Sequence, residues 1–447
     1  MTSRIRCGRK QSSRPQNGAL LLVIMLLSGG LLVPVIPAPS ARAESVWASS
    51  SFDDFNATGA YFTNCELNGT GNETSIVLKT APDWVQKNVP KSPAARAFGG
   101  MAAIDTDDKT VIFGGTDFSS ELGDTWLYDL GDNKWTDMAP AESPPARQYC
   151  QLATVFGDDK AVLFGGWYYD DNWNPITLND TWVYDLSENI WYDRTPAVSP
   201  PPTATFAMAT VFDTDTVVMF TGIRDVYYYE AIVETWTYDI SDNVWTKKHP
   251  ASSPSGRYGQ AMAAVWNDDK VVLFGGYNDT VGTLGDTWIF DLSDDQWYQK
   301  SPATRPSARY FTSLATRYDD DKVMLFGGFT DDTNIYDLGD DSWTLLTPAH
   351  KPAMRMAPYM ATVARTENTV VFGGEYADIY QDTWVWEPGA HARSGEFRSP
   401  QKFVGGPAYF LTINWSATLP NQTSIKFQVR TAETEYNLTW RNFTGPD

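Results

Sequence analysis

One short pattern occurs six times along the chain and divides it into units of similar length. In each copy an apolar run ends in a glycine doublet, and an acidic residue, a Thr and a Trp follow after a variable gap. The doublets are Gly114-Gly115, Gly165-Gly166, Gly275-Gly276, Gly327-Gly328 and Gly373-Gly374, with Thr221-Gly222 as a degenerate third copy. Each unit holds four short runs rich in Val, Phe, Tyr, Trp and Thr, separated by turn residues. A four-stranded sheet that recurs about every 50 residues is typical of a β-propeller.

Two tryptophans mark fixed places in the unit. The first ends the acidic-Thr-Trp triplet, as Trp126, Trp182, Trp236, Trp288 and Trp384, and Asn334 replaces it in the fifth copy. The second, nine residues later, is Trp135, Trp191, Trp245, Trp297 or Trp343. With Tyr-Asp pairs such as Tyr128-Asp129, this pattern resembles the kelch repeat over about residues 77–390. The resemblance implies an all-β, kelch-type propeller, and we interpret the paired Trp as packing between blades and the Gly doublets as backbone requirements.

The spacing of these markers predicts a closed ring of six blades. From the second Trp of one unit to the first doublet position of the next is always 30 residues, and Trp84 has the same spacing to Gly114. The sixth unit lacks a second Trp of its own. We therefore expect the strand around Val77–Trp84 to complete the blade formed by residues 355–388, which removes open sheet edges.

The length of the unit varies only between the doublet and the first Trp, in the loop between strands 2 and 3 of a blade. Variable loops on a rigid scaffold commonly carry binding residues, and Arg, Tyr and Trp are enriched at binding hot spots. An arginine also recurs where strand 1 begins, with Thr203 in its place in the third unit. The candidate ligand contacts on this face are Arg96, Arg147, Arg257, Arg309, Arg355, Trp167, Tyr168, Tyr169, Trp173, Tyr227, Tyr228 and Tyr229. Two interpretations stay open: the repeated arginines are part of the architecture or bind a ligand, and the loop aromatics bind or only pack.

The flanks predict export and a further module. Residues 1–43 have a basic start, an apolar run and a small-residue end at Ala43, which indicates a signal peptide or, alternatively, an N-terminal anchor. Residues 44–76 form an extension, and residues 391–447 resemble the start of a β-sandwich-like module. We expect a secreted or cell-surface chain that meets a membrane only through its first segment, with a monomeric propeller. The glycosylation candidates in the flanks are Asn56, Asn68, Asn72, Asn414, Asn421, Asn437 and Asn442.

Charge and cysteine content narrow the classes of partner. The chain has 34 basic and 55 acidic residues, for a net charge of −21, which argues against nucleic acid as a partner. Only three cysteines are present. Cys65 and Cys150 either pair or remain isolated thiols, and Cys150 lies in an apolar strand pattern where a free thiol commonly packs.

No catalytic motif is found. The three histidines, His249, His350 and His391, do not occupy matching repeat positions, so we expect no metal and no cofactor. The favoured function is therefore binding or adhesion to a protein or glycan through the 2–3 loops. A sugar-active enzyme or oxidase on the same scaffold, and a structural component of a cell envelope, are the alternatives.

Overall fold

The structure is a computed structural model that describes residues 82–223, 231–318 and 320–388 in full, together with the backbone of strands in the two flanks. Two compact units are present. One is Asp83–Pro388, and the other combines Met1–Pro82 with Gly389–Asp447. The described part of the chain is entirely β-structure and turns, and it has no helix with the length and apolar composition needed to cross a bilayer.

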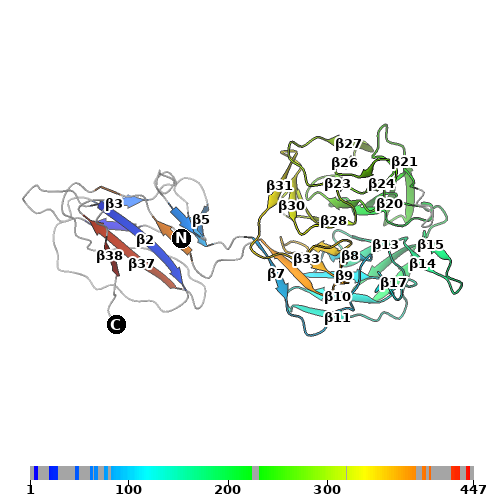
Figure 1. The fold of residues 1–447 in the computed structure, drawn as a ribbon, viewed down its shortest axis with the longest axis horizontal. Coiled ribbons are helices and arrows are strands. Elements are labelled where there is room, and N and C mark those ends of the chain that lie inside the picture. Colours follow the sequence, from blue (N-terminus) through cyan, green and yellow to red (C-terminus); the bar gives the residue numbers. More distant parts are fainter. Residues whose placement is uncertain are drawn as a thin grey trace, which may run out of the picture. The chain divides into compact units, whose positions relative to one another are not determined.

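Asp83–Pro388 forms six four-stranded antiparallel sheets, the blades of a propeller. Blades one to three consist of β8 (Gly100–Ile104), β9 (Lys109–Phe113), β10 (Thr125–Asp129), β11 (Lys134–Asp137); β12 (Gln151–Thr154), β13 (Lys160–Phe164), β16 (Thr181–Asp185), β17 (Ile190–Asp193); and β18 (Ala207–Thr210), β19 (Thr216–Phe220), β20 (Thr235–Asp239), β21 (Val244–Lys248). Blades four to six consist of β22 (Ala261–Ala264), β23 (Lys270–Phe274), β26 (Thr287–Asp291), β27 (Gln296–Lys300); β28 (Thr312–Thr316), β29 (Lys322–Gly327), β30 (Thr333–Asp337), β31 (Ser342–Leu346); and β32 (Tyr359–Thr362), β33 (Thr369–Phe372), β34 (Thr383–Glu387), β7 (Asp83–Lys87). Figure 1 shows these blades in order around a ring, from cyan through green and yellow to orange.

The ring closes as the spacing predicts. β7 pairs antiparallel with β34, with Trp84 opposite Trp386, and the blue strand lies beside the orange strands of the last blade in Figure 1. The innermost strands also contact one another all round the ring, including β32 with β8. One boundary differs from the expectation: the closing strand begins at Asp83, whereas Val77 lies in β6 (Ser75–Leu78), which pairs with β5 (Cys65–Asn68).

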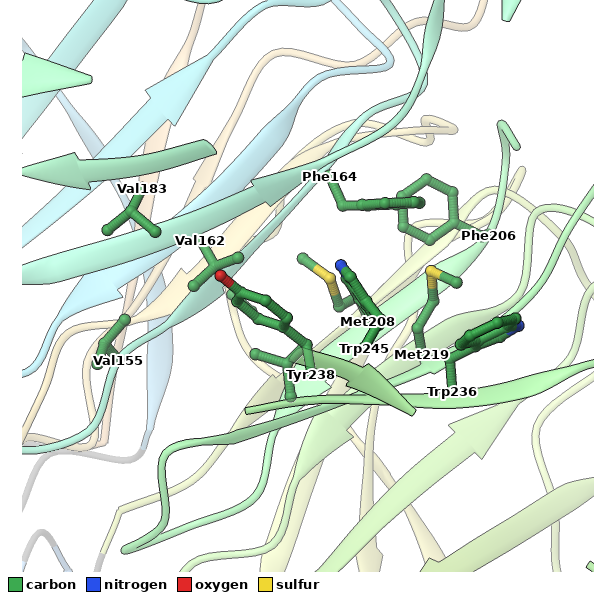
Figure 2. Close-up of a cluster of buried hydrophobic side chains, with 12 residues drawn as sticks. Val155, Val162, Phe164, Val183, Phe206, Met208, Met219, Trp236, Tyr238 and Trp245 are labelled. Carbon is green, nitrogen blue, oxygen red and sulfur yellow. The ribbon is translucent and has the colours of Figure 1, made fainter. Parts of the chain in front are cut away.

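The core lies between blades, which explains the apolar composition of the inner strands. Strand 2 of each blade is buried on both faces because each sheet packs against a neighbour on either side, as in β13, where all residues after Lys160 are buried. The outermost strands are solvated on one face, so only their Trp is buried. Figure 2 shows the cluster between blades two and three, in which Phe164 and Phe206 meet edge to face with ring centroids 5.6 Å apart.

A ring of hydrogen bonds between Trp and Thr side chains, which recur at the same positions of each repeat, links all six blades. The indole N–H of each outer-strand Trp donates to the Thr of the acidic-Thr-Trp triplet in the preceding blade, at 2.8–2.9 Å. The six pairs are Trp135–Thr383, Trp191–Thr125, Trp245–Thr181, Trp297–Thr235, Trp343–Thr287 and Trp84–Thr333. The interpretation of these Trp residues as inter-blade contacts is confirmed, and the hydrogen bonds also satisfy the indole donors in the core.

The second glycine of the doublet is required by a close approach. Gly115 has a φ of +96°, and a Cβ there would lie 1.9 Å from the hydroxyl oxygen of Tyr359 and 2.6 Å from the carbonyl oxygen of Ala97. Any other residue would displace the neighbouring blade, so the doublet is structural.

The flanks contribute short strands to the other unit. A sheet is ordered β38 (Thr439–Asn442), β37 (Ser424–Ala432), β2 (Leu20–Ser28), β35 (Gly395–Arg398), β4 (Tyr61–Thr63); β36 (Lys402–Phe403) also pairs with β2, and β1 (Ile5–Gly8) pairs with β3 (Val46–Ser49). This pairing belongs to the unprocessed chain, and cleavage after Ala43 stays a prediction. The β-sandwich-like module and the glycosylation candidates lie outside the residues described in full.

Candidate functional site

The five repeated arginines lie inside the propeller, where each forms a two-pronged ion pair with the aspartate of the triplet. The pairs are Arg96–Asp124, Arg147–Asp180, Arg257–Asp286, Arg309–Asp332 and Arg355–Asp382. Each Nη1 also donates to the carbonyl oxygen of the first doublet glycine of its own blade. The arginine side chains are at most 1% exposed. Of the two interpretations left open for these arginines, the geometry matches the architectural one, and their place among the candidate ligand contacts is corrected: the guanidinium groups face the protein interior and not the solvent.

The ion pairs also fix the charge of the aspartates. Burial alone would raise the pKa of Asp286, but the hydrogen bonds and charge of Arg257 outweigh it and hold that pKa below its usual range. The pKa values of Asp124, Asp332 and Asp382 are lowered for the same reason. These four pairs are therefore ionised and electrically neutral as units near neutral pH.

A continuous network of aromatic rings covers the face from which the 2–3 loops emerge; we call it the aromatic face. Its members are Phe98, Phe118, Tyr149, Trp167, Tyr169, Trp173, Tyr258, Tyr277, Tyr310, Phe311, Phe329 and Tyr376. Each ring lies within 4.3 to 6.5 Å, centroid to centroid, of another member. The network runs from the second blade across the ring to the sixth.

The centre of the aromatic face lies at one end of the central channel of the propeller. The residue two places after the arginine position has a left-handed backbone in all six blades, with φ between 46° and 66°, at Phe98, Tyr149, Thr205, Gly259, Phe311 and Ala357. The Phe98 ring lies 4.3 Å from that of Tyr149 and 5.3 Å from that of Phe311, centroid to centroid. Left-handed non-glycine residues are strained and persist where the surroundings enforce them, commonly at functional sites. Phe98, Tyr149 and Phe311, three of these left-handed residues, line the upper cavity of the channel.

This central channel is narrow. Its upper cavity has a volume of about 120 Å³ and its lower cavity about 80 Å³, and both are lined by Met101, Leu152, Met208, Met262, Leu314 and Met360. Pockets for small organic ligands are typically about 300–1,000 Å³. Within the described residues the surface of the aromatic face, and not the channel, is therefore the candidate site.

Five rings of the aromatic face are open to solvent. The exposed fraction is 75% for Trp173, 59% for Phe118, 52% for Tyr376, 40% for Tyr169 and 37% for Phe329. Trp173 and Tyr169 belong to the hairpin of β14 (Trp167–Tyr169) and β15 (Pro175–Thr177), which extends the second blade's loop. Exposed aromatic residues that touch one another form the kind of patch that marks an interaction surface.

Part of this face is predictable from the sequence. Of the loop aromatics among the candidate contacts, Trp167, Tyr169 and Trp173 belong to the network, and Tyr168 is half-buried. Tyr227, Tyr228 and Tyr229 lie outside the described residues. The rings at the end of the channel were not predicted, although Phe98, Tyr149 and Phe311 follow the repeated arginine at a constant distance. This constant offset, two residues after the arginine position, is the sequence signal that could have identified these rings.

The described residues also bear on the sequence predictions for the cysteines and for metal binding. Cys150 is a free, fully buried thiol at the base of this face, and burial raises its pKa to about 11. Of the two alternatives, the isolated, packed thiol is therefore the one observed. No group of three or more His, Cys, Asp and Glu side chains in the described ranges is arranged to hold a metal ion.

Comparison with known protein families agrees with this architecture. The family described as the KLHDC2/KLHL20/DRC7 Kelch-repeats domain matches residues 70–265 and, in an overlapping match, 215–392. The chain belongs to the kelch-repeat family. A kelch propeller is a scaffold suited to protein binding.

Individual relatives are distant. The chain is 25% identical over 249 residues to Kelch domain-containing protein 1 of Mus musculus, covering 49% of this chain and 59% of the relative. It is 25% identical over 265 residues to Kelch domain-containing protein 2 of Bos taurus, covering 52% and 61%. Adagio-like protein 1 of Oryza sativa subsp. japonica matches at 24% over 249 residues, covering 51% and 38%. The chain thus spans less than two thirds of the length of these relatives.

Proposed function

We propose that this kelch propeller is a binding module of an exported or cell-surface chain and that it engages a polypeptide partner through the aromatic face. The observation that carries the proposal is the continuous contact of twelve rings, five of them exposed, on the loop face. Rigid aromatic side chains give large contact area at low entropic cost, which suits them to recognition.

The exported location rests on the first 43 residues, whose basic, apolar and small-residue regions are ordered as in a signal peptide. Expression in a secreting host followed by N-terminal sequencing tests it. The expected mature terminus is Glu44. Recovery of the chain with its first segment intact would instead indicate the anchor.

The binding site is tested with a matched pair of double variants. Tyr169→Ala with Trp173→Ala removes two exposed rings from the aromatic face, and Tyr192→Ala with Tyr298→Ala removes two comparably exposed rings, 40% and 47%, from outer strands β17 and β27. Partners captured by the unmodified chain from surface and secreted protein are then titrated against both variants.

We expect the Tyr169/Trp173 variant to lose about 100-fold in affinity, as for two hot-spot aromatics, and the outer-strand control to change little. Equal binding by both variants would refute the aromatic face as the site. If the chain bound glycans on an array and captured no protein partner, the proposed ligand would be a sugar and not a polypeptide.

A further inference from the structure

The described residues of the 2–3 loops carry charge of only one sign. Apart from the carboxylates bound to the repeated arginines and to Lys247, the described loop residues carry the acids Asp117, Glu121, Asp170, Asp171, Asp279, Asp331, Glu375 and Asp378. No Lys or Arg occurs among the described residues of these loops. Among the described residues, one basic group pairs with one of these eight acids: the Nζ of Lys351 lies 2.7 Å from Asp331.

These carboxylates stand beside the rings of the aromatic face. Acidic and aromatic residues are adjacent at Asp117-Phe118, Tyr169-Asp170 and Glu375-Tyr376, and Phe329 and Tyr277 each lie two residues before an aspartate. At the tip of the β14–β15 hairpin the backbone N–H of Trp173 donates to the carbonyl oxygen of Asp170 at 2.9 Å, which holds an exposed indole next to two carboxylates. All five fully described loops therefore combine a π-face with a negative charge.

The exposed aromatic rings and the loop carboxylates favour the same kind of ligand, a cationic one. A cationic side chain over an aromatic ring is attracted by the ring quadrupole, and a nearby carboxylate adds Coulombic attraction. An acidic ligand would be repelled by these loop carboxylates, and the repeated arginines could not offset that repulsion because they are buried in their own ion pairs. We infer that the aromatic face recognises a basic segment of polypeptide, in which Arg or Lys side chains lie between the rings and carboxylates. This inference rests on the proposed binding function and specifies its ligand.

A random-peptide phage library panned on the full chain provides the probe. Selection at low salt and elution at high salt should enrich peptides with more Arg and Lys than the unselected library, because contacts between exposed charges are screened by salt. Selected sequences with no such excess would overturn the inference, as would acidic ones.

Matched charge variants then test the most enriched peptide. Asp171→Asn, Asp279→Asn and Asp378→Asn remove three exposed loop carboxylates that make no side-chain hydrogen bond recorded within the described residues. Asp132→Asn, Asp242→Asn and Asp340→Asn remove the same charge from exposed 3–4 turns on the opposite face. We expect the loop variant to bind about tenfold more weakly and the control within about twofold of the unmodified chain.

The outcomes of these binding experiments distinguish a failure of the basic-ligand inference from a failure of the proposed binding function. If the Tyr169/Trp173 variant loses the peptide but the loop-charge variant does not, the aromatic face binds and the basic ligand is refuted. If loop and control charge variants weaken binding equally, only the net charge acts and the inference also fails. If no peptide is enriched over the library, or if none of the variants affects binding, both the inference and the proposed site fail.

Discussion

At the residue scale, each repeated arginine places a positive charge in the propeller interior and the triplet aspartate makes that burial tolerable. The third blade shows the natural alternative. It has Thr203 in place of the arginine and Glu234 in place of the aspartate, and Glu234 pairs with Lys247 and accepts a hydrogen bond from Trp236. The blade still forms its four strands, so a blade can lack the whole ion pair. In the other five blades we expect each member of the pair to depend on the other, because a lone buried charge is costly.

The first prediction follows from that dependence. Asp286→Asn leaves the guanidinium of Arg257 buried without a counter-charge, and we expect a loss of about 3–5 kcal/mol in the free energy of unfolding, measured by urea denaturation. The double variant Arg257→Thr with Asp286→Glu copies these two positions of the third blade and should be less destabilised than Asp286→Asn, because it leaves no buried guanidinium unpaired. A double variant that loses more would show that the pair matters for reasons other than its charge.

The effect of Asp286→Asn should also depend on pH. The pKa of Asp286 is lowered in the folded state, so its contribution to stability is fully present above the unfolded-state pKa of about 3.9 and is lost as the pH falls through the lower folded-state value. The stability gap between the unmodified chain and the variant should therefore narrow below about pH 4. A gap that stays constant in acid would contradict this assignment.

At the level of elements, the closing strand β7 holds the last blade to the first residues of the propeller. The Trp84 indole donates to Thr333 at 2.8 Å and packs against Trp386 and Phe326, with ring centroids 5.5 and 5.4 Å away. Trp84→Ala removes the hydrogen bond and leaves a cavity, so we expect a cost of about 3–5 kcal/mol by denaturant unfolding. Trp84→Phe, which keeps most of the packing, should cost less, and equal costs would mean that the hydrogen bond and not the ring volume dominates.

Sequence spacing predicts those elements whose chain separations are constant. The 30-residue interval assigned Trp84 to the last blade. In all five blades that have the repeated arginine, it lies 18 residues before the glycine whose carbonyl oxygen it binds. The arginine's aspartate partner lies 23 to 33 residues away, across the variable loop, so no fixed offset identifies it. The aromatic face was only partly predictable because its members come from different loops and meet through backbone turns that the sequence does not specify.

At the scale of the whole molecule, the propeller begins and ends at one place. Asp83 and Glu387 are register partners, as Lys134 and Asp129 are in the first blade, where residues 130–133 connect them. We expect a circular permutant to fold in which Glu387 is joined to Asp83 by a copy of residues 130–133 and the chain opens between Asp171 and Asn172. Circular dichroism and a single cooperative thermal transition would confirm it. A permutant opened within β13, inside the core, is the matched negative control and should not fold.

The adjacency of Asp83 and Glu387 also determines how the ring bears force. Tension applied through the two flanks pulls β7 and β34 apart from the end that they share. The hydrogen bonds between the two strands are then loaded and broken one after another, which is the unzipping geometry. A load applied to the 2–3 loops on the opposite face is instead shared among loops anchored in separate blades. We therefore expect the propeller to open at a lower force when it is pulled through its flanks than when it is pulled from its 2–3 loops.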